Sequence, residues 1–207
     1  MKKGCKLLVI LLSVLLITVF LPGCGGGGDD GGEFVIPDEI QELMDVSVEL
    51  AIDSAKQLDG AWGDMHVAMM ESGEEDGYAD FETMRAKLVE LIEATGADYI
   101  YAMYPSDADD LEADFFITVD GSEDADDFGT MYEAELGMVM SWQRGIAKTT
   151  TYAWGDDNGF HWSAFAPIHN SDGDVVAVLG LDYPAPYVEN HPEWDYDSDD
   201  WNEFEWE

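Results

Sequence analysis

The spacing of apolar residues changes at Gly96, and this change constrains the fold more than any other feature of the chain. Before Gly96, apolar residues recur every three or four positions, which predicts helices. One helix begins at Asp38 and contains Ile40, Leu43, Met44, Val48, Ala51, Ile52, Ala55 and Leu58, with the same spacing continuing to Met70; another covers residues 81–95. After Gly96, short runs rich in β-forming residues predict strands at 97–105, 115–121, 149–154, 160–170 and 174–183. Residues 127–145 are mixed and partly helical in pattern. Two helices followed by about five antiparallel strands with a helical insert predict an α+β fold.

The chain begins with a pattern typical of a targeting segment. Lys2, Lys3 and Lys6 precede an apolar run, residues 7–21, which has the length of a signal-peptide core and is shorter than the roughly 20 residues of a transmembrane helix. Leu21-Pro22-Gly23-Cys24 then resembles a bacterial lipobox, so we expect residues 1–23 to be a cleaved lipoprotein signal peptide and Cys24 to be lipidated. The alternative is an uncleaved anchor helix. Both interpretations place the rest of the chain outside the cytoplasmic membrane of a bacterium.

Three further segments follow the predicted signal peptide. Residues 24–37 are rich in glycine and acidic residues and are predicted to form a tether. Residues 38–186 have the length and pattern of a single domain. Residues 187–207 combine acids with three tryptophans, and we expect this tail to be disordered unless its aromatic side chains dock on the domain or on a partner. Loss of Cys5 and lipidation of Cys24 leave no thiol for a disulfide, so stability must come from a packed core.

The chain is strongly acidic, with 46 acidic residues against 8 basic ones and a formal net charge of −38. Nucleic acid is excluded as a partner because phosphate binding depends on Lys and Arg, and an anionic membrane surface would repel the domain. The acidity fits either a solvated surface suited to a salty medium or calcium binding. Residues 107–114 and 120–127 form the oxygen-rich loops that are calcium candidates, but neither has EF-hand spacing. We favour the solvated surface and assign no metal.

Four segments follow one another in a characteristic order: Gly96–Tyr104, Phe115–Asp120, "DFGTMYE" (127–133) and "FHWSAFAPIHNSDGDVVAVLGLDY" (160–183). Together they resemble an extracytoplasmic Cache sensor domain, the PAS-like (PDC-type) fold of the outer portions of chemoreceptors, sensor kinases and cyclic-di-nucleotide enzymes. The resemblance covers residues 38–183. Its most specific part is a strand reaching Ala166-Pro167-Ile168, a turn with Asp172-Gly173 and a final strand, 175–182.

The resemblance implies a long N-terminal helix packed on a five-stranded antiparallel sheet. The concave face of that sheet would hold a small polar ligand such as an amino acid, a carboxylate or an amine, with residues 120–150 closing over it. No output module follows in this sequence, so we expect such a domain to bind its ligand and to act through a membrane signalling partner. The long helix is the natural element to transmit the closure.

Seven residues are candidates for the ligand site. Arg144 would clamp a carboxylate through its guanidinium fork, or it is a surface residue paired with an acid. The resemblance places Asp182 where amine-binding members of the family have an acid; the alternative is a turn residue at the end of a strand. The aromatic candidates, which either line the pocket or belong to the core, are Tyr101, Trp142, Tyr152, Trp154 and Trp162.

No enzymatic activity and no cofactor are expected. The four histidines have no metal-ligand spacing, Ser163 has no nucleophile elbow, and no glycine-rich phosphate loop follows a strand. The rival function is a structural or interaction module with a filled pocket, acting through its acidic surface or its tryptophan-rich tail. Small residues on the sheet face favour ligand binding, whereas large aromatic residues such as Tyr101, Trp154 and Trp162 filling it favour the rival.

Overall fold

The computed structural model describes residues 38–73, 77–108, 110, 113–150, 153–156 and 159–191. The predicted signal peptide, Cys24, the tether, Tyr152 and residues 192–207 lie outside this part of the chain. Within the part that is described, none of the helices has the length and apolar character needed to cross a membrane.

Three helices precede the sheet: α1 (Asp38–Leu58), α2 (Ala61–Ser72) and α3 (Phe81–Thr95). The apolar spacing that continues from Asp38 to Met70 therefore belongs to two helices, which are separated at residues 59–60. Gly60 has a φ angle of 78°, which glycine adopts without a steric penalty, and the chain turns there. The α3 helix has the predicted bounds. It ends at Gly96, which has a φ angle of 74° and donates its N–H to the carbonyl of Ile92.

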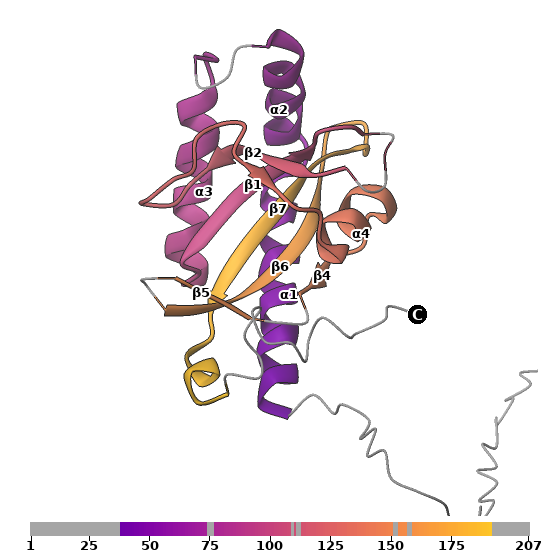
Figure 1. Cartoon of the computed structure of the whole chain (residues 1–207). Helices are drawn as coiled ribbons and strands as arrows, with labels where there is room; N and C mark the ends of the chain where they lie inside the picture. The colour runs from indigo at the N-terminus through magenta and orange to yellow at the C-terminus, as the bar shows by residue number, and fades with distance from the viewer. Residues whose placement is uncertain are drawn as a thin grey trace, which may run out of the picture. The chain divides into compact units, whose positions relative to one another are not determined.

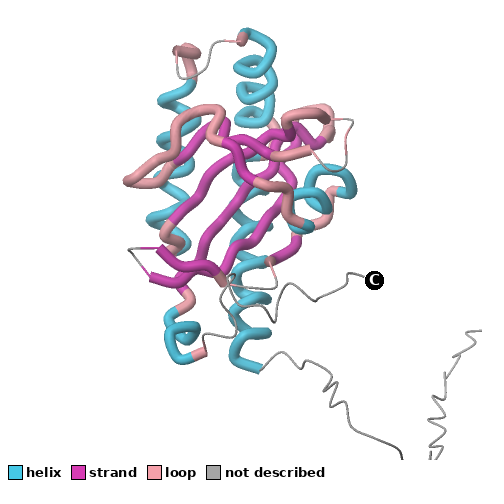
Figure 2. The backbone as a smooth tube through the Cα atoms, viewed as in Figure 1, coloured by secondary structure: helices cyan, strands magenta, loops and turns pink. Residues whose placement is uncertain are grey.

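The strands form one antiparallel sheet with the order β3-β2-β1-β7-β6-β4, and β5 pairs separately with β6 (Figure 2). The strands are β1 (Tyr99–Pro105), β2 (Phe115–Asp120), β3 (Met131–Tyr132), β4 (Lys148–Thr149), β5 (Trp154–Asp156), β6 (Gly159–His169) and β7 (Val175–Pro184). The predicted α+β class is confirmed. The strand predicted at 149–154 corresponds to two short strands, β4 and β5, and the short edge strand β3 is additional.

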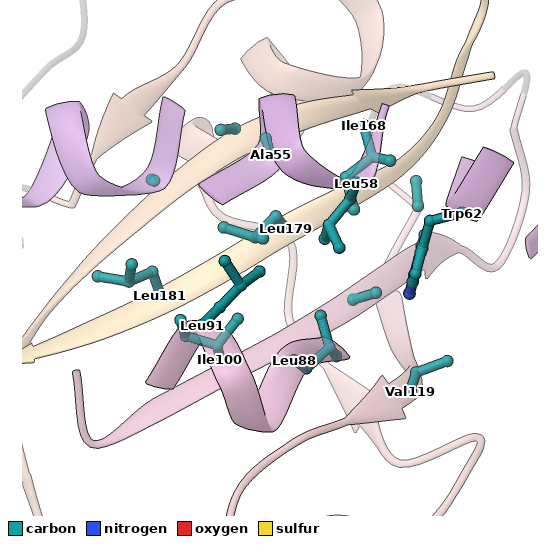
Figure 3. Packing of buried hydrophobic residues seen from close by; sticks show 14 of the residues in the cluster. Ala55, Leu58, Trp62, Leu88, Leu91, Ile100, Val119, Ile168, Leu179 and Leu181 are labelled. Atoms are coloured by element: carbon teal, nitrogen blue, oxygen red, sulfur yellow. The ribbon is translucent and has the colours of Figure 1, made fainter. Parts of the chain in front are cut away.

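Helices cover both faces of the sheet. The helices α1, α2 and α3 pack on one face, and α4 (Leu136–Arg144) packs on the other, beside β4, β6 and β7 (Figure 1). Because side chains alternate along a strand, Leu179 and Leu181 of β7 face the long helices, whereas Val178 and Asp182 face α4. The helix-side core includes Leu58, Trp62, Leu88, Leu91, Ile100 and Leu179 (Figure 3). Each such side chain contributes about 1.5–3 kcal/mol when fully buried, which holds the helical layer on the sheet.

The break between α1 and α2 is tied to the turn that joins β6 and β7. The N–H of Gly60 donates to the carbonyl of His169 at 2.9 Å. Asp59 accepts the N–H of His169 at 2.8 Å, and Asp64 accepts the N–H of Ser171 at 2.9 Å. The hydroxyl and the N–H of Ser171 hold the pKa of the Asp64 carboxyl below its ordinary value. We call this set of contacts the hairpin clamp.

The described chain continues past β7 into a 3-10 helix, η1 (Pro186–Asn190). Val188 of η1 is fully buried against Ile40, Leu43 and Trp162. The sequence predicts disorder from residue 187, whereas residues 187–190 are helical because Val188 fills an apolar site beside the N-terminal half of α1.

We expect Gly63→Ala to lower the free energy of unfolding by about 1–3 kcal/mol, the usual cost of overpacking. A Cβ atom on Gly63 would overlap the backbone carbonyl of His169 within the hairpin clamp. This cost exceeds the gain of about 0.5–1 kcal/mol that alanine brings to a helix. Urea unfolding of both proteins measures the difference. Gly77→Ala is the matched control, because nothing lies within 4 Å of a Cβ atom there; equal effects of the two substitutions would contradict the clamp.

Candidate functional site

A buried acid lies on the α4 face of the sheet. Asp182 on β7 is 2% exposed and pairs in register with Tyr99 on β1 and with Ser163 on β6. Tyr101, Ser163 and Asp182 all face α4, because each alternates with neighbours that face the long helices. Trp154 on β5 joins them through Ser163. We call Tyr101, Trp154, Ser163 and Asp182 the Asp182 cluster.

Hydrogen bonds of defined direction connect the Asp182 cluster. The indole Nε1 of Trp154 donates to Ser163 Oγ at 2.8 Å. The hydroxyl of Tyr101 donates to Asp182 Oδ1 at 3.4 Å, and the Ser163 hydroxyl also bonds to the Asp182 carboxyl. An indole N–H can only donate, so Ser163 Oγ accepts from Trp154. Its own hydrogen is free to bond to the Asp182 carboxyl when that group is ionised.

No cation neutralises Asp182: none of the ion pairs of the described lysine, arginine and histidine residues includes it. Its charged neighbours are instead Glu135, which precedes α4, and Asp120, which ends β2. Burial raises the pKa of the Asp182 carboxyl to about 7; the hydrogen bonds from Ser163 and Tyr101 oppose this shift, and the two acids add to it. Burial also raises the pKa of Tyr101 well above its ordinary value, so its hydroxyl remains a donor.

A histidine–aspartate pair lies next to the Asp182 cluster. His161 Nε2 and Asp98 Oδ2 are 2.9 Å apart, with the histidine side chain fully buried and the aspartate side chain 44% exposed. The His161 ring packs against Trp154 and the edge of Tyr99, with ring centroids 4.6 Å and 5.2 Å away. The pair thus helps to hold Trp154 in place, and Trp154 in turn positions Ser163.

In the segment between β2 and α4, backbone N–H groups donate to the side chain of Asp120. The two carboxylate oxygens of Asp120 accept the N–H groups of Ser122 at 2.8 Å and Asp126 at 2.9 Å. Arg85 of α3 donates to the carbonyls of Asp120 and Ser122. The first acid of the calcium-candidate loop, residues 120–127, therefore binds backbone amides of its own loop.

The structure brings together three of the seven predicted site residues. Tyr101, Trp154 and Asp182 belong to the Asp182 cluster, whereas Tyr152 lies outside the described residues. Ser163 completes the cluster.

The other three predicted residues lie elsewhere. Trp142 of α4 contacts Tyr104, with ring centroids 5.0 Å apart. Arg144 is exposed in the last turn of α4. Trp162 is fully buried on the opposite face of the sheet, where its indole donates to the carbonyl of Thr150, which places it in the core beside α1.

Sequence reasoning missed several residues around Asp182. Ser163 could have been found from the sequence. Counting residue pairs outward from the turn between the last two strands places it opposite Asp182. Tyr99 and His161 occupy alternate positions on the same face and could be found in the same way. Glu135 had no such signal, since its position depends on how a loop and α4 pack.

Aromatic side chains cover the middle of the α4 face. Tyr101 lies across Gly180, which has no side chain to displace the ring, and Phe165 packs against Gly137 of α4. These rings extend an apolar cluster that contains Met103, Phe115, Ile117, Met138 and Val178. The Asp182 cluster therefore adjoins a packed region of the sheet face.

A groove of about 610 Å³ lies in the helical layer, on the other side of the sheet from Asp182. It runs between the α1–α2 break and α3, and its lining includes Trp62, Met65, Ala86 and Lys87. Acidic side chains of Asp59, Glu82 and Glu90 also line it.

No family model and no curated protein matches this chain. Similar solved structures include the ligand-binding domain of the Campylobacter jejuni chemoreceptor Tlp3 in complex with 4-methylisoleucine, at 12% identity and a TM-score of 0.44, covering 74% of this chain and 54% of that one. The periplasmic domain of RsbU from Chlamydia trachomatis is 16% identical with a TM-score of 0.36, covering 74% of this chain and 58% of that one. The periplasmic sensory domain of the C. jejuni chemoreceptor Tlp1 is 11% identical with a TM-score of 0.32, covering 73% and 64%. This chain thus spans less than two thirds of the length of each.

The raised pKa of Asp182 predicts a pH dependence of stability. The native carboxyl keeps its proton up to about pH 7, whereas an unfolded aspartate releases it near pH 4. The stabilising contribution of this group is therefore complete below about pH 4 and is lost as the pH rises to about 7. Asp182→Asn stays neutral, so the free energy of unfolding of the variant relative to the wild type should rise by about 1.4 kcal/mol per pH unit over this range.

Urea unfolding at several values between about pH 5 and pH 8 measures this difference. Asp172→Asn removes the same charge from an exposed turn and should change the free energy of unfolding by less than about 0.5 kcal/mol throughout. A difference for Asp182→Asn that is as flat as that of the control would contradict a buried, protonated Asp182.

Proposed function

We propose that this chain is a ligand-binding, sensor-type domain of Cache plan, held outside the cytoplasmic membrane by lipid on Cys24, and that its ligand is a small organic cation. The observation that carries this proposal is the buried Asp182 carboxyl, which receives two hydroxyl groups and no cation among the described residues. The order of elements, with long N-terminal helices, a central antiparallel sheet and the α4 insert, supports the Cache plan.

An uncompensated acid inside a protein lowers stability, because burial removes the water that stabilises its charge. A structural role for residue 182 would be met better by a neutral side chain, so the acid indicates binding. A ligand ammonium group would supply the missing charge by donating to Asp182 and Glu135. The faces of Tyr101 and Trp154 would attract the same cation through their π electrons.

An amine fits this place better than a carboxylate or an amino acid. A ligand carboxylate would meet Asp182, Glu135 and Asp120, which repel it. Arg144, the residue predicted to clamp a carboxylate, is exposed in the last turn of α4. An amino acid needs both an acid and such a clamp at one site.

Ligand entry requires movement of the segment between β2 and α4. Asp182 and Ser163 are almost completely buried, so no ligand reaches them without displacement of their cover. The segment contains the short edge strand β3, whose Met131 and Tyr132 pair with β2, and Gly129 and Thr130 also form backbone hydrogen bonds with Ile117. A short strand at the edge of a sheet opens at a lower cost in free energy than the central strands do. This supports closure of residues 120–150 over a ligand.

The rival function, an interaction module with a filled sheet face, also has a specific observation in its favour. Tyr101 over Gly180 and Phe165 against Gly137 fill the middle of the α4 face. Binding in that case would use another surface, and the groove between the α1–α2 break and α3 is one. The two functions differ in what Asp182→Asn does: it abolishes binding of an amine in the first and leaves partner binding intact in the second.

A thermal-shift screen of the chain from residue 24, carrying Cys24→Ser, tests the proposal against amines, amino acids, carboxylates and calcium. An amine present at a hundred times its dissociation constant should add about 2.7 kcal/mol of stability and raise the melting temperature by several degrees. Asp182→Asn should abolish this shift, while Arg144→Ala should leave it unchanged. Stabilisation by carboxylates that depends on Arg144 would contradict the cation assignment, and no shift with any small molecule would favour the interaction module.

The anchor is tested separately. Expression of the full chain in a bacterium fed with an alkyne-labelled fatty acid should give a labelled protein in the membrane fraction. Cys24→Ser should lose the label, because the Cys24 sulfur carries the acyl chains. Cys5→Ser is the matched control and should retain the label. Label on the Cys24→Ser protein would contradict the lipobox assignment.

A further inference from the structure

Hydrogen bonds connect the Asp182 carboxyl to Trp154 through Ser163. Trp154 Nε1 is a donor only, so Ser163 Oγ receives it at 2.8 Å, and the Ser163 hydroxyl donates to Asp182 when that carboxyl is ionised. Tyr101 donates to Asp182 Oδ1 from the neighbouring strand. A change of charge at Asp182 must therefore alter the bond between Ser163 and Trp154.

Two acids face Asp182 from other elements packed against it, and a neutral tyrosine lies near them. Glu135 approaches from the start of α4, Asp120 from the end of β2, and the uncharged Tyr132 from β3. The neighbouring pair consists of His161, which is on β6, and Asp98, which is the residue before β1. A carboxylate at 182 would thus add a negative charge to a buried acidic surrounding, which favours its neutral form.

We propose that Asp182 carries a proton in the free site and that a cationic ligand binds by displacing that proton. This inference rests on the proposed function, and it adds that occupancy of the site is controlled by pH. The carboxyl O–H bond breaks, its proton passes to the solvent, and the positive charge of the ligand takes its place. The total charge of the buried site is therefore the same before and after binding.

This exchange explains how the same buried site can be stable both without a ligand and with a bound cation. The free site avoids a buried unpaired carboxylate, and the occupied site contains an ion pair that excludes water. The pKa of about 7 at Asp182 places the exchange near neutral pH, where the free energy needed to remove the proton is small. Below that pH, affinity for the cation should fall about tenfold per unit, and above it affinity should level off.

The first half of the proposal is tested on ligand-free protein by two-dimensional ¹H–¹⁵N NMR of the tryptophan indole groups. The chain from residue 24 with Cys24→Ser contains all 7 tryptophans, and Trp154→Phe identifies the Trp154 indole peak. We expect that peak to titrate with a midpoint near pH 7. In Asp182→Asn the same peak should not move, while the other indole peaks report that the variant is folded.

His161 supplies the decisive control, because its ring also contacts Trp154. His161→Gln should leave the titration of the Trp154 peak in place. If His161→Gln removes the titration and Asp182→Asn retains it, the histidine is the titrating group and the proposal is overturned. A Trp154 peak that does not move between about pH 5.5 and pH 8.5 also overturns it.

The second half is tested with methylammonium chloride in phosphate buffer, by measuring its dissociation constant at about pH 6, 7 and 8. With a pKa of about 7, we expect affinity to rise about fivefold between pH 6 and pH 7 in the wild type and about twofold more between pH 7 and pH 8. Binding that is independent of pH overturns proton displacement while leaving the proposed function intact. Titration of Trp154 through Asp182 without binding of any amine overturns the displacement and the proposed function together.

Discussion

The β6–β7 hairpin is the element on which both faces of the sheet depend. Its turn is held by Asp59 and Asp64 at the break between α1 and α2, and its strands present Ser163 and Asp182 to the α4 side. Because β7 also pairs with β1, the hairpin cannot shift without changing the surroundings of the acid. The hairpin clamp fixes the turn end of the hairpin to the break between α1 and α2, whereas Ser163 and Asp182 pair near its other end.

The scarcity of basic residues explains why Asp182 has no cationic partner in the part of the chain that the structure describes. Lys56 and Lys87 form ion pairs with acids one turn away on their own helices, and such exposed pairs contribute little to stability. Arg85 is committed to the carbonyls of the loop after β2. The composition that excludes nucleic acid as a partner therefore also leaves a buried acid open to a ligand of opposite charge.

Local pattern predicts the elements of this fold better than its site. Apolar spacing and Gly96 fix α3, but the α1–α2 break is invisible in the spacing because it depends on a turn 110 residues away. At the site, alternation finds Tyr101, and the resemblance to Cache domains finds Asp182. Alternation cannot assign Trp162, since both sides of β6 carry apolar residues and either could face the long helices. Glu135 and the cover over Asp182 depend on loop packing, which no local pattern encodes.

Asp182 is the proposed acceptor of a cation, and a crystal structure of the protein grown with methylammonium at about pH 8 tests this role most directly. We expect the ammonium group within hydrogen-bond distance of the Asp182 carboxyl, against the rings of Tyr101 and Trp154. An Asp182 that still contacts only Tyr101 and Ser163, in crystals whose methylammonium is absent or bound elsewhere, would contradict it.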